Sequence, residues 1–507
     1  MYQPTKLRLP LLFFTLLLCN VISAQESKKF AHNALAEKIY LQLDNEVYTT
    51  NKTIWFKAVV LNAATHDPKL SSGTLYVEIV SSNKEVLDSK LIKITNGIGH
   101  GSFDLDSGYQ QGKYVIRAYT QWNKNFNSDF LYEKSIQIFA ESENVNRSQP
   151  VDNIRLIDTI RDRLQIRADL YPNLIDSRHS KKLEVYISDG ITNDTLTVSK
   201  EGGVYSLETD VSSTASYIKL TMKTKNELLY STSFSPDSDY IDLQFFPESG
   251  GLVDGLSSKV GFKALDINGR GKYVEGDILG ENDEIIASFK SNALGMGHFV
   301  LQDPNAQIQY KAKVKLASGT YKTITLPKVI TLGTVMSVSS RGNTLTVYVS
   351  SNYKNNKNVK LKASSRGYEY FSDEASLENG YHTFVIPKQD LPEGVIAFTL
   401  LNDKSIPMIE RLFFNMKGDD RLMISAATNK AEYEQREQMT IDISSADKNG
   451  TPISTNTSVL VVDKGEFEDI QELRENILSY FLLSSDIRGQ IESPGAYFKT
   501  DSDLNID

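Results

Sequence analysis

Short stretches in which apolar and polar residues alternate dominate the chain. They are rich in Val, Ile, Tyr and Thr and are bounded by Gly, Asn, Asp or Ser. A period of two is the pattern of a strand with one face in a core, and repeated short strands with turn residues between them are typical of antiparallel sandwiches. The clearest examples are residues 73–82, 181–190, 216–225, 343–351, 394–403 and 457–465. The pattern predicts an all-β chain, a tandem array of immunoglobulin- or fibronectin-like β-sandwiches.

Helical periodicity is confined to the C-terminal part of the chain. Residues 467–483 place Ile470, Leu473, Ile477 and Tyr480 on one stripe. This spacing predicts a single amphipathic helix.

The glycine-rich segment 291–302, SNALGMGHFVLQ, has a partner at 96–105, NGIGHGSFDL. In both, glycines stand four and two positions before a phenylalanine, Phe299 or Phe103. A phosphate-binding loop would have to lead into a helix, whereas these glycines lead into strands. We therefore expect the glycines to provide a turn or bulge and the phenylalanines to cap sandwich cores.

An aromatic-Lys-Ala strand precedes each glycine segment, at 55–60 and at 261–266. The repeated unit is thus about 100 residues long, which indicates an array of similar domains rather than a thin-repeat solenoid. Residues 428–463 resemble the opening strand pair 43–67, although less closely.

The N-terminus has the features of a secretory signal. Lys6 and Arg8 precede an apolar run at 9–19, and small residues follow. This order predicts a signal peptide cut between Ala24 and Gln25. The run is shorter than the ~20 residues of a spanning helix, and no later run is longer, so we expect an exported mature chain without a transmembrane segment.

Cys19 is the only cysteine. It is either a lipidated anchor or a small apolar residue within the signal, and Leu18 stands where lipoprotein signals usually carry Gly, Ala or Ser. If the cut follows Ala24, the mature chain has no disulfide, thiolate nucleophile or thiolate zinc site. The formal net charge of −9 argues against nucleic-acid binding, which needs a basic face.

Candidate chemistry is sparse. The six histidines fall roughly one per expected module and lack metal-ligand spacing, and no Gly-x-Ser-x-Gly elbow occurs. DINGRG at 266–271 and DKNG at 447–450 lack the downstream Glu of an EF-hand, and we expect hairpin turns there. We therefore predict no catalytic residue, no metal site and no cofactor. Trp122, in the polar segment 121–130, is the candidate ligand contact, and Trp55 is expected in a core.

Three segments resemble strands of the macroglobulin domain found in alpha-2-macroglobulins: 37–60, 245–271 with the following LGMGHFVL, and 431–463. The whole chain resembles large exported envelope proteins of gram-negative bacteria. Some of these continue into a region like the plug of TonB-dependent receptors. This sequence lacks that region, as a shortened member or a truncated frame would.

We expect seven segments along the chain. The predicted ranges are a signal peptide at 1–24, macroglobulin-like sandwiches at 25–148 and 241–328, further sandwiches at 149–240 and 329–420, a partial or complete macroglobulin-like sandwich at 421–465, and a helix with a tail at 466–507.

The resemblance implies a rigid scaffold without the protease trap, because the thioester of alpha-2-macroglobulins needs a cysteine that this chain lacks after residue 19. We predict a non-catalytic exported scaffold or binding protein, in the periplasm, at the outer membrane or on the cell surface. Its expected partners are envelope proteins, such as a TonB-dependent transporter, or a glycan or peptide ligand. Two alternatives stay open: an accessory of TonB-dependent uptake of polysaccharide or peptide, and a polysaccharide- or peptide-degrading enzyme.

Overall fold

The computed structural model describes most of the chain between residues 34 and 498. The described ranges are 34–68, 72–109, 112–139, 151–160, 163–172, 182–201, 204–212, 215, 217–223, 228–234, 239–267, 269–316, 318–353, 358–418, 421–461 and 474–498. The expected signal peptide, with Cys19, Ala24 and Gln25, lies outside these ranges, as do His32 and His179.

The first unit is a two-sheet sandwich with one shared core. One sheet has the order β1-β3-β6, and the other has the order β2-β8-β7-β4-β5. The strands are β1 (Glu37–Leu43), β2 (Val47–Thr49), β3 (Thr53–Asn62), β4 (Thr74–Ser81), β5 (Val86–Lys93), β6 (Ile98–Asp104), β7 (Gly112–Tyr119) and β8 (Tyr132–Phe139), with the 3-10 turns η1 (Trp122–Asn125) and η2 (Ser128–Phe130) between the last two.

The second unit has seven strands in the order β15-β14-β11-β12-β13-β10-β9. β12 pairs with β11 along most of its length and with β13 only at Lys200 and Glu201, so β12 links two layers that share a core. The strands are β9 (Val151–Ile160), β10 (Arg163–Leu170), β11 (Lys182–Ser188), β12 (Asn193–Glu201), β13 (Val204–Ser212), β14 (Ile218–Lys223) and β15 (Leu228–Phe234).

The third unit combines the sheets β16-β18-β21 and β20-β19-β22-β23 with the parallel pair β17-β24 around one core. Its strands are β16 (Asp242–Pro247), β17 (Leu252–Val253), β18 (Ser258–Leu265), β19 (Glu275–Leu279), β20 (Ile285–Lys290), β21 (Met296–Leu301), β22 (Lys311–Lys315), β23 (Tyr321–Thr325) and β24 (Val329–Ile330).

The fourth unit packs the sheet β25-β26-β29 on the sheet β28-β27-β30-β31. Its elements are β25 (Thr334–Arg341), β26 (Thr344–Ser351), β27 (Asn358–Ser365), β28 (Tyr368–Ser376), β29 (Tyr381–Pro387), the 3-10 turn η4 (Lys388–Asp390), β30 (Gly394–Asn402) and β31 (Pro407–Asn415). A hairpin of β32 (Met423–Thr428) and β33 (Ile441–Ala446) follows and forms a sheet of its own.

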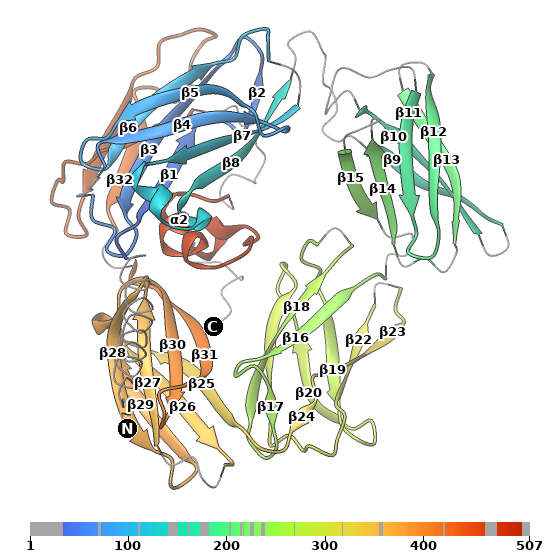
Figure 1. Ribbon diagram of the computed structural model, residues 1–507, viewed down its shortest axis with the longest axis vertical. Coiled ribbons are helices and arrows are strands. Elements are labelled where there is room, and N and C mark those ends of the chain that lie inside the picture. The colour runs from blue at the N-terminus through green and yellow to red at the C-terminus, as the bar shows by residue number, and fades with distance from the viewer. Residues whose placement is uncertain are drawn as a thin grey trace, which may run out of the picture.

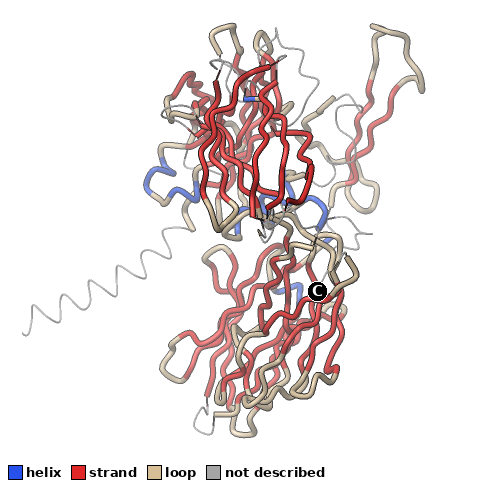
Figure 2. Tube along the Cα trace, turned by 90° about the vertical axis from the view of Figure 1, so that its right-hand side faces the viewer, coloured by secondary structure: helices blue, strands red, loops and turns tan. Residues whose placement is uncertain are grey.

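The chain is thus an all-β array of sandwiches, as the alternation predicted. Figure 1 shows the four units following one another around a circuit, with the fourth returning beside the first and β32 on the outer side of the first. Figure 2 shows strands throughout and only short helical pieces. The C-terminal pieces are α2 (Ile477–Leu482), η8 (Ser484–Asp486) and η9 (Pro494–Phe498), and α2 lies between the first and fourth units (Figure 1).

The predicted role of the glycines is partly wrong. The left-handed turn glycines are Gly97 (φ 75°) and Gly295 (φ 72°), whereas Gly99, Gly101 and Gly297 lie within β6 and β21. These strand glycines allow close approach instead of a turn, because a Cβ on Gly101 or Gly297 would lie 2.7 Å or 2.4 Å from a phenylalanine ring on the paired strand.

The phenylalanines behave as predicted. Phe103 is 0% exposed and Phe299 is 5% exposed, each within the core of its unit. The turns at 266–271 and 447–450 are also confirmed. Gly269 and Gly450 have φ of 77° and 83°, and their N–H groups donate to the backbone carbonyls of Asp266 and Asp447, both at 3.0 Å.

The predicted position of Trp55 is wrong, because its side chain is 60% exposed. Ile54, Phe56 and Ala58 are buried, so the even positions of β3 face the core and Trp55 and Lys57 face outward. The strand begins with apolar residues at both parities, and the alternation therefore did not distinguish its two faces.

The predicted helix is interrupted, because residues 474–476 are not helical. α2 begins at Ile477 because Asn476 is extended (φ −128°, ψ 177°) and its side chain accepts hydrogen bonds from the N–H groups of Leu478 and Ser479. Of the predicted stripe, Tyr480 packs against the core of the first unit, whereas Ile477 is 43% exposed. Phe481 and Leu482 are buried as well. Ile470 and Leu473 lie outside the described residues.

Candidate functional site

Residues 474–498, named here the clasp, contact three of the four units. Phe481 belongs to the core of the first unit, and Glu492 accepts a hydrogen bond from Lys263 of the third unit at 3.0 Å. The ring of Phe498 lies edge-on to Phe414 of the fourth unit, with 5.5 Å between centroids. The clasp therefore links units that are far apart in the sequence.

An aromatic cluster fastens α2 to the first unit. The ring of Tyr480 lies 5.4 Å from that of Tyr40 and 5.7 Å from that of Tyr132, and Phe481 next to it is 5% exposed. Tyr132 also donates a hydrogen bond to the carbonyl of Leu41 at 3.0 Å. Burial raises the pKa of Tyr480 and Tyr132 well above the ordinary range, so these rings stay neutral and act by packing.

A buried charge cluster lies just beyond the C-terminal end of α2. Asp486 forms an ion pair with Lys38 of β1, and its second oxygen lies 3.5 Å from Nη1 of Arg366, which follows β27. All three side chains are 8–9% exposed. Lys38 also donates to Oγ of Ser485 at 2.9 Å, and Arg366 donates to the carbonyl of Ala64 at 3.1 Å. One carboxylate thus joins the first unit, the fourth unit and the clasp.

The electrostatics of this cluster favour a neutral imidazole beside it. Burial lowers the pKa of Lys38, and the adjacent Asp486 carboxylate opposes that shift. Burial, followed by the positive charges of Arg366 and Lys38, lowers the pKa of His66 to about 3. The His66 ring lies edge-on to Phe481 at 5.4 Å, and its Nε2 is buried without a hydrogen-bond partner.

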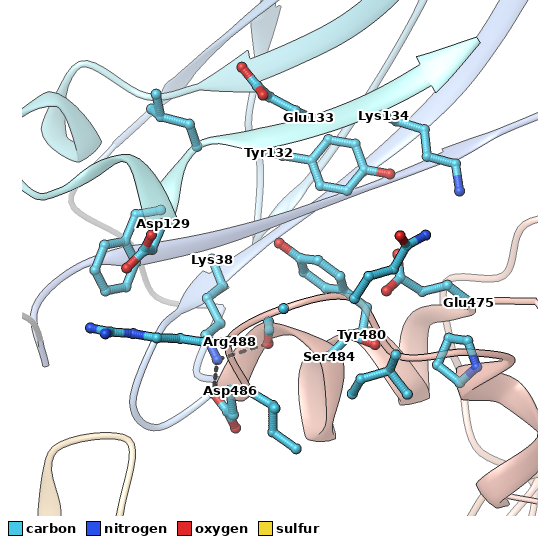
Figure 3. A pocket seen from close by; sticks show the side chains of 18 of the residues that line it. Lys38, Asp129, Tyr132, Glu133, Lys134, Glu475, Tyr480, Ser484, Asp486 and Arg488 are labelled. Atoms are coloured by element: carbon cyan, nitrogen blue, oxygen red, sulfur yellow. Dashed lines mark hydrogen bonds and ion pairs between the residues drawn. The ribbon is translucent and has the colours of Figure 1, made fainter. Parts of the chain in front are cut away.

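A cleft of about 2090 Å³ lies between the clasp and the first unit. Figure 3 shows Lys38 and Asp486 in its wall. Charged side chains of both signs line it: Asp129, Glu133 and Lys134 from the first unit, and Glu475, Arg488 and Glu492 from the clasp. The volume is about twice the upper end of ordinary small-molecule pockets, so the cleft is large enough for an extended chain.

Within the described ranges, no group of three or more His, Cys, Asp or Glu side chains is placed to hold a metal ion. His100 and His298 are exposed and lie on the strands β6 and β21. His382 lies on β29 of the fourth unit.

Trp122, the predicted ligand contact, lies in η1 and is partly buried. Its Nε1 donates to the carbonyl of Leu35 at 2.8 Å, and its ring lies edge-on to Phe126 at 5.7 Å. Asn125 and Phe126 of the same segment line the cleft. Ligand contact by Trp122 stays a prediction. Its indole N–H already donates a hydrogen bond within the first unit.

No pattern in the sequence pointed to Lys38, Arg366 and Asp486. Lys38 and Asp486 are 448 positions apart, and no local pattern relates such residues. The one local signal was Asn476 followed by Ser479, the cap that fixes where α2 begins.

Within the described ranges, none of the helices combines the length and the apolar character needed to cross a membrane. No protein-family model and no curated protein matches the sequence. Solved structures do match. The native conformation of E. coli alpha-2-macroglobulin has a TM-score of 0.34 and 11% identity, over 82% of this chain and 32% of that one.

Salmonella alpha-2-macroglobulin reacted with methylamine gives a TM-score of 0.33, 11% identity and the same two coverages. A tetra-tandem repeat from the extending region of a large adhesion protein gives 0.17 and 11%, over 75% of this chain and 98% of that one. Bacterial alpha-2-macroglobulins are thus among the structural neighbours of this chain, which spans about a third of their length. At these TM-scores the similarity says nothing about activity, ligands or partners.

Proposed function

We propose that the chain is a non-catalytic scaffold of the cell envelope that binds an extended polypeptide segment in the cleft beside the clasp. The observation that carries the proposal is the clasp itself: the buried Lys38–Asp486–Arg366 cluster fixes one wall of a large cleft against the other. A preformed cleft binds with less ordering cost than a flexible one.

The charges of the cleft favour a polypeptide over a neutral glycan. Side chains of both signs lie on facing walls, with Asp129, Glu133 and Lys134 opposite Glu475 and Arg488. Arg488 is exposed and forms no ion pair within the described part of the chain, so it is available to a carboxylate of the bound segment.

Binding is tested with a fluorescein-labelled unfolded polypeptide, reduced and carboxymethylated α-lactalbumin, titrated with the mature protein. We expect saturable binding that weakens at least about fivefold in Arg488→Ala. Arg341→Ala is the matched control, because Arg341 is an exposed arginine at the end of β25, away from the cleft, and it should leave binding unchanged. Binding of labelled dextran instead, or a polypeptide affinity that Arg488→Ala does not alter, contradicts the proposal.

The absence of catalysis is tested in the same samples. The polypeptide and the dextran should keep their mass after prolonged incubation with the protein. Turnover that disappears in a single His or carboxylate variant would favour the hydrolase alternative.

Export and envelope partners are part of the proposal, supported by the signal-like N-terminus and the family resemblance. We expect the protein in the envelope fraction, where crosslinking and co-purification identify its partner. Recovery of a TonB-dependent transporter would favour a role in nutrient uptake, and recovery of the protein in the cytoplasm would contradict export.

A further inference from the structure

The β32–β33 hairpin repeats the first hairpin of the first unit in register. In both hairpins the strands are antiparallel, and each residue pair of one has a counterpart in the other. The matched pairs are Ile39↔Val60, Leu41↔Ala58 and Leu43↔Phe56 in β1–β3, and Ile424↔Ser445, Ala426↔Ile443 and Thr428↔Ile441 in β32–β33.

The side-chain bonds at the end of the first strand are repeated as well. Tyr48 donates to Oδ1 of Asp44 at 2.7 Å, and Tyr433 donates to Oδ1 of Asn429 at 2.7 Å. In both places the same oxygen also accepts a backbone N–H at 3.0 Å, from Trp55 in β3 and from Thr440 directly before β33. The hairpin is therefore the opening hairpin of a further sandwich of the same kind.

The core-facing side chains of this hairpin are uncovered. In the first unit the inward residues of β1 and β3 are buried beneath the second sheet, whereas their counterparts are largely exposed. The exposures are 1% for Ile39, 0% for Ile54 and 4% for Phe56, against 59% for Ile424, 48% for Met439 and 36% for Ile441. Removing such apolar side chains from water is favourable, so a partner that shields them gains binding free energy.

The outer edge of the hairpin is also open. In the first unit β6 pairs along the edge of β3, from Val59↔Ile98 to Thr53↔Asp104. Within the described ranges no strand pairs with residues 441–444 at the corresponding edge of β33, while Ala446 bridges to Pro452 and Ser445 exchanges hydrogen bonds with Ile453. An open edge beside an apolar face is the arrangement by which a sheet accepts an added strand.

We propose that β33 accepts a β-strand from another polypeptide, which pairs antiparallel with its open edge. The donor is an extended segment like β6, whose core-facing positions carry small or apolar residues, as Gly99, Gly101 and Phe103 do. Its apolar residues then lie beside Ile441 and Ile443 on the same face of the sheet, as Phe103 of β6 lies beside Phe56 in the first unit. The surface is distinct from the cleft beside the clasp, so this interaction is independent of the proposed cleft function.

The probe for this interaction is a synthetic peptide with the sequence of residues 96–106, NGIGHGSFDLD. It contains β6, the strand that completes the equivalent hairpin of the first unit. The fluorescein-labelled peptide is titrated with the full chain, and anisotropy reports binding. We expect saturable binding, and loss of binding when alternate peptide nitrogens are methylated on the pairing edge.

Two variants localise the interaction. Ile441→Glu places a charge on the apolar face and should weaken peptide binding at least about tenfold, and the exposure of this side chain leaves the rest of the fold intact. Ser444→Glu is the matched control, because Ser444 is exposed on the opposite face of the same strand, and it should change binding less than about twofold.

Three results would contradict the proposal. Absence of saturable peptide binding, or binding that Ile441→Glu does not weaken, overturns the proposal. So does a homodimer in light scattering that Ile441→Glu dissociates, because a second copy would then occupy the surface.

Discussion

The ring of Phe262 in β18 lies against the backbone of Gly297 in the paired strand β21. The two residues are direct partners in the ladder, and a Cβ on Gly297 would lie 2.4 Å from Cζ of the ring. Phe56 and Gly101 repeat the relationship in the first unit, where the distance would be 2.7 Å. An aromatic ring that covers a cross-strand glycine shields the backbone and fixes register.

Gly297→Ala should therefore destabilise the third unit by about 1–3 kcal/mol, because the methyl group overpacks the ring of Phe262 and the carbonyl of Lys290. Urea denaturation followed by tyrosine fluorescence measures the change. Gly261→Ala is the control on β18 of the same ladder, since its nearest neighbour is the carbonyl of Phe246 at 3.7 Å, and it should be neutral or slightly stabilising. Equal losses in the two variants would contradict the packing explanation.

Asp486→Ala should release the clasp. Lys38 and Arg366 would then lie buried without a counterion, which typically costs about 3–5 kcal/mol. Hydrogen exchange of residues 477–482 should accelerate more than that of the sandwich cores, because the loss is local. Glu374→Ala removes an ion pair to Lys360 whose carboxylate side chain is 73% exposed and should cost less than about 1 kcal/mol. Unchanged exchange in α2 would show that packing alone holds the clasp.

His66 should make the clasp sensitive to acid. Its folded pKa of about 3 lies below the ordinary 6.5, so the unfolded state binds the proton first. The contribution to stability is complete above pH 6.5 and falls as the pH drops toward 3, by up to about 1.4 kcal/mol per pH unit. Thermal melts across this range measure the slope.

The matched variant is His66→Asn, which cannot titrate and tolerates the left-handed backbone at this position (φ 58°). It should flatten the dependence of melting temperature on pH in that window. His298→Asn, at an exposed site on β21, is the control for the substitution itself. A slope that persists in His66→Asn would assign the acid sensitivity to other groups.

Asp189→Ala should destabilise the second unit by at least about 2 kcal/mol. The buried carboxylate accepts from the N–H groups of Ile191 at 2.9 Å and Ser212 at 3.0 Å and from the hydroxyl of Thr192 at 3.0 Å. Burial raises the pKa of Asp189, but these hydrogen bonds outweigh it and hold the value at about 2. Urea denaturation at pH 7 measures the loss, and the exposed Asp194→Ala is the control.

The pH dependence at Asp189 provides a second readout. Because the folded pKa lies below the ordinary 3.8, the carboxylate contributes fully above pH 3.8 and loses its contribution as the pH falls toward 2. The difference in stability between the natural chain and Asp189→Ala should narrow over that window. A constant difference would mean that the charge of the carboxylate does not contribute to the stability of the second unit.

The strands were predictable because each sandwich imposes a period of two on its own local sequence, as in β26 and β27, where inward residues alternate with outward ones. The face of Trp55 was not predictable, since Ile54, Trp55 and Phe56 are all apolar and only packing decides which parity points inward. The extent of α2 depended on one cap, Asn476, which overrides a longer helical pattern.

The charge cluster at the clasp was beyond local reasoning for a different reason. Lys38 lies among buried residues of β1 and Asp486 lies in a short turn. The residues next to each of them in the sequence give no sign of a buried ion pair. Only the return of the fourth unit beside the first brings Arg366 to them (Figure 1). Which units touch depends on the directions that all the linkers between them impose on the chain. A local hydrophobic period carries no information about those directions.

The Lys38–Asp486 pair also sets an order of events during synthesis. Lys38 emerges early and Asp486 emerges 448 residues later, so the sandwiches can form one after another while the lysine is still hydrated. Its desolvation waits until Asp486 has been synthesised. Nascent chains that stop short of residue 486 should therefore hold folded β-modules that are not yet joined, and closure follows the folding of the separate units.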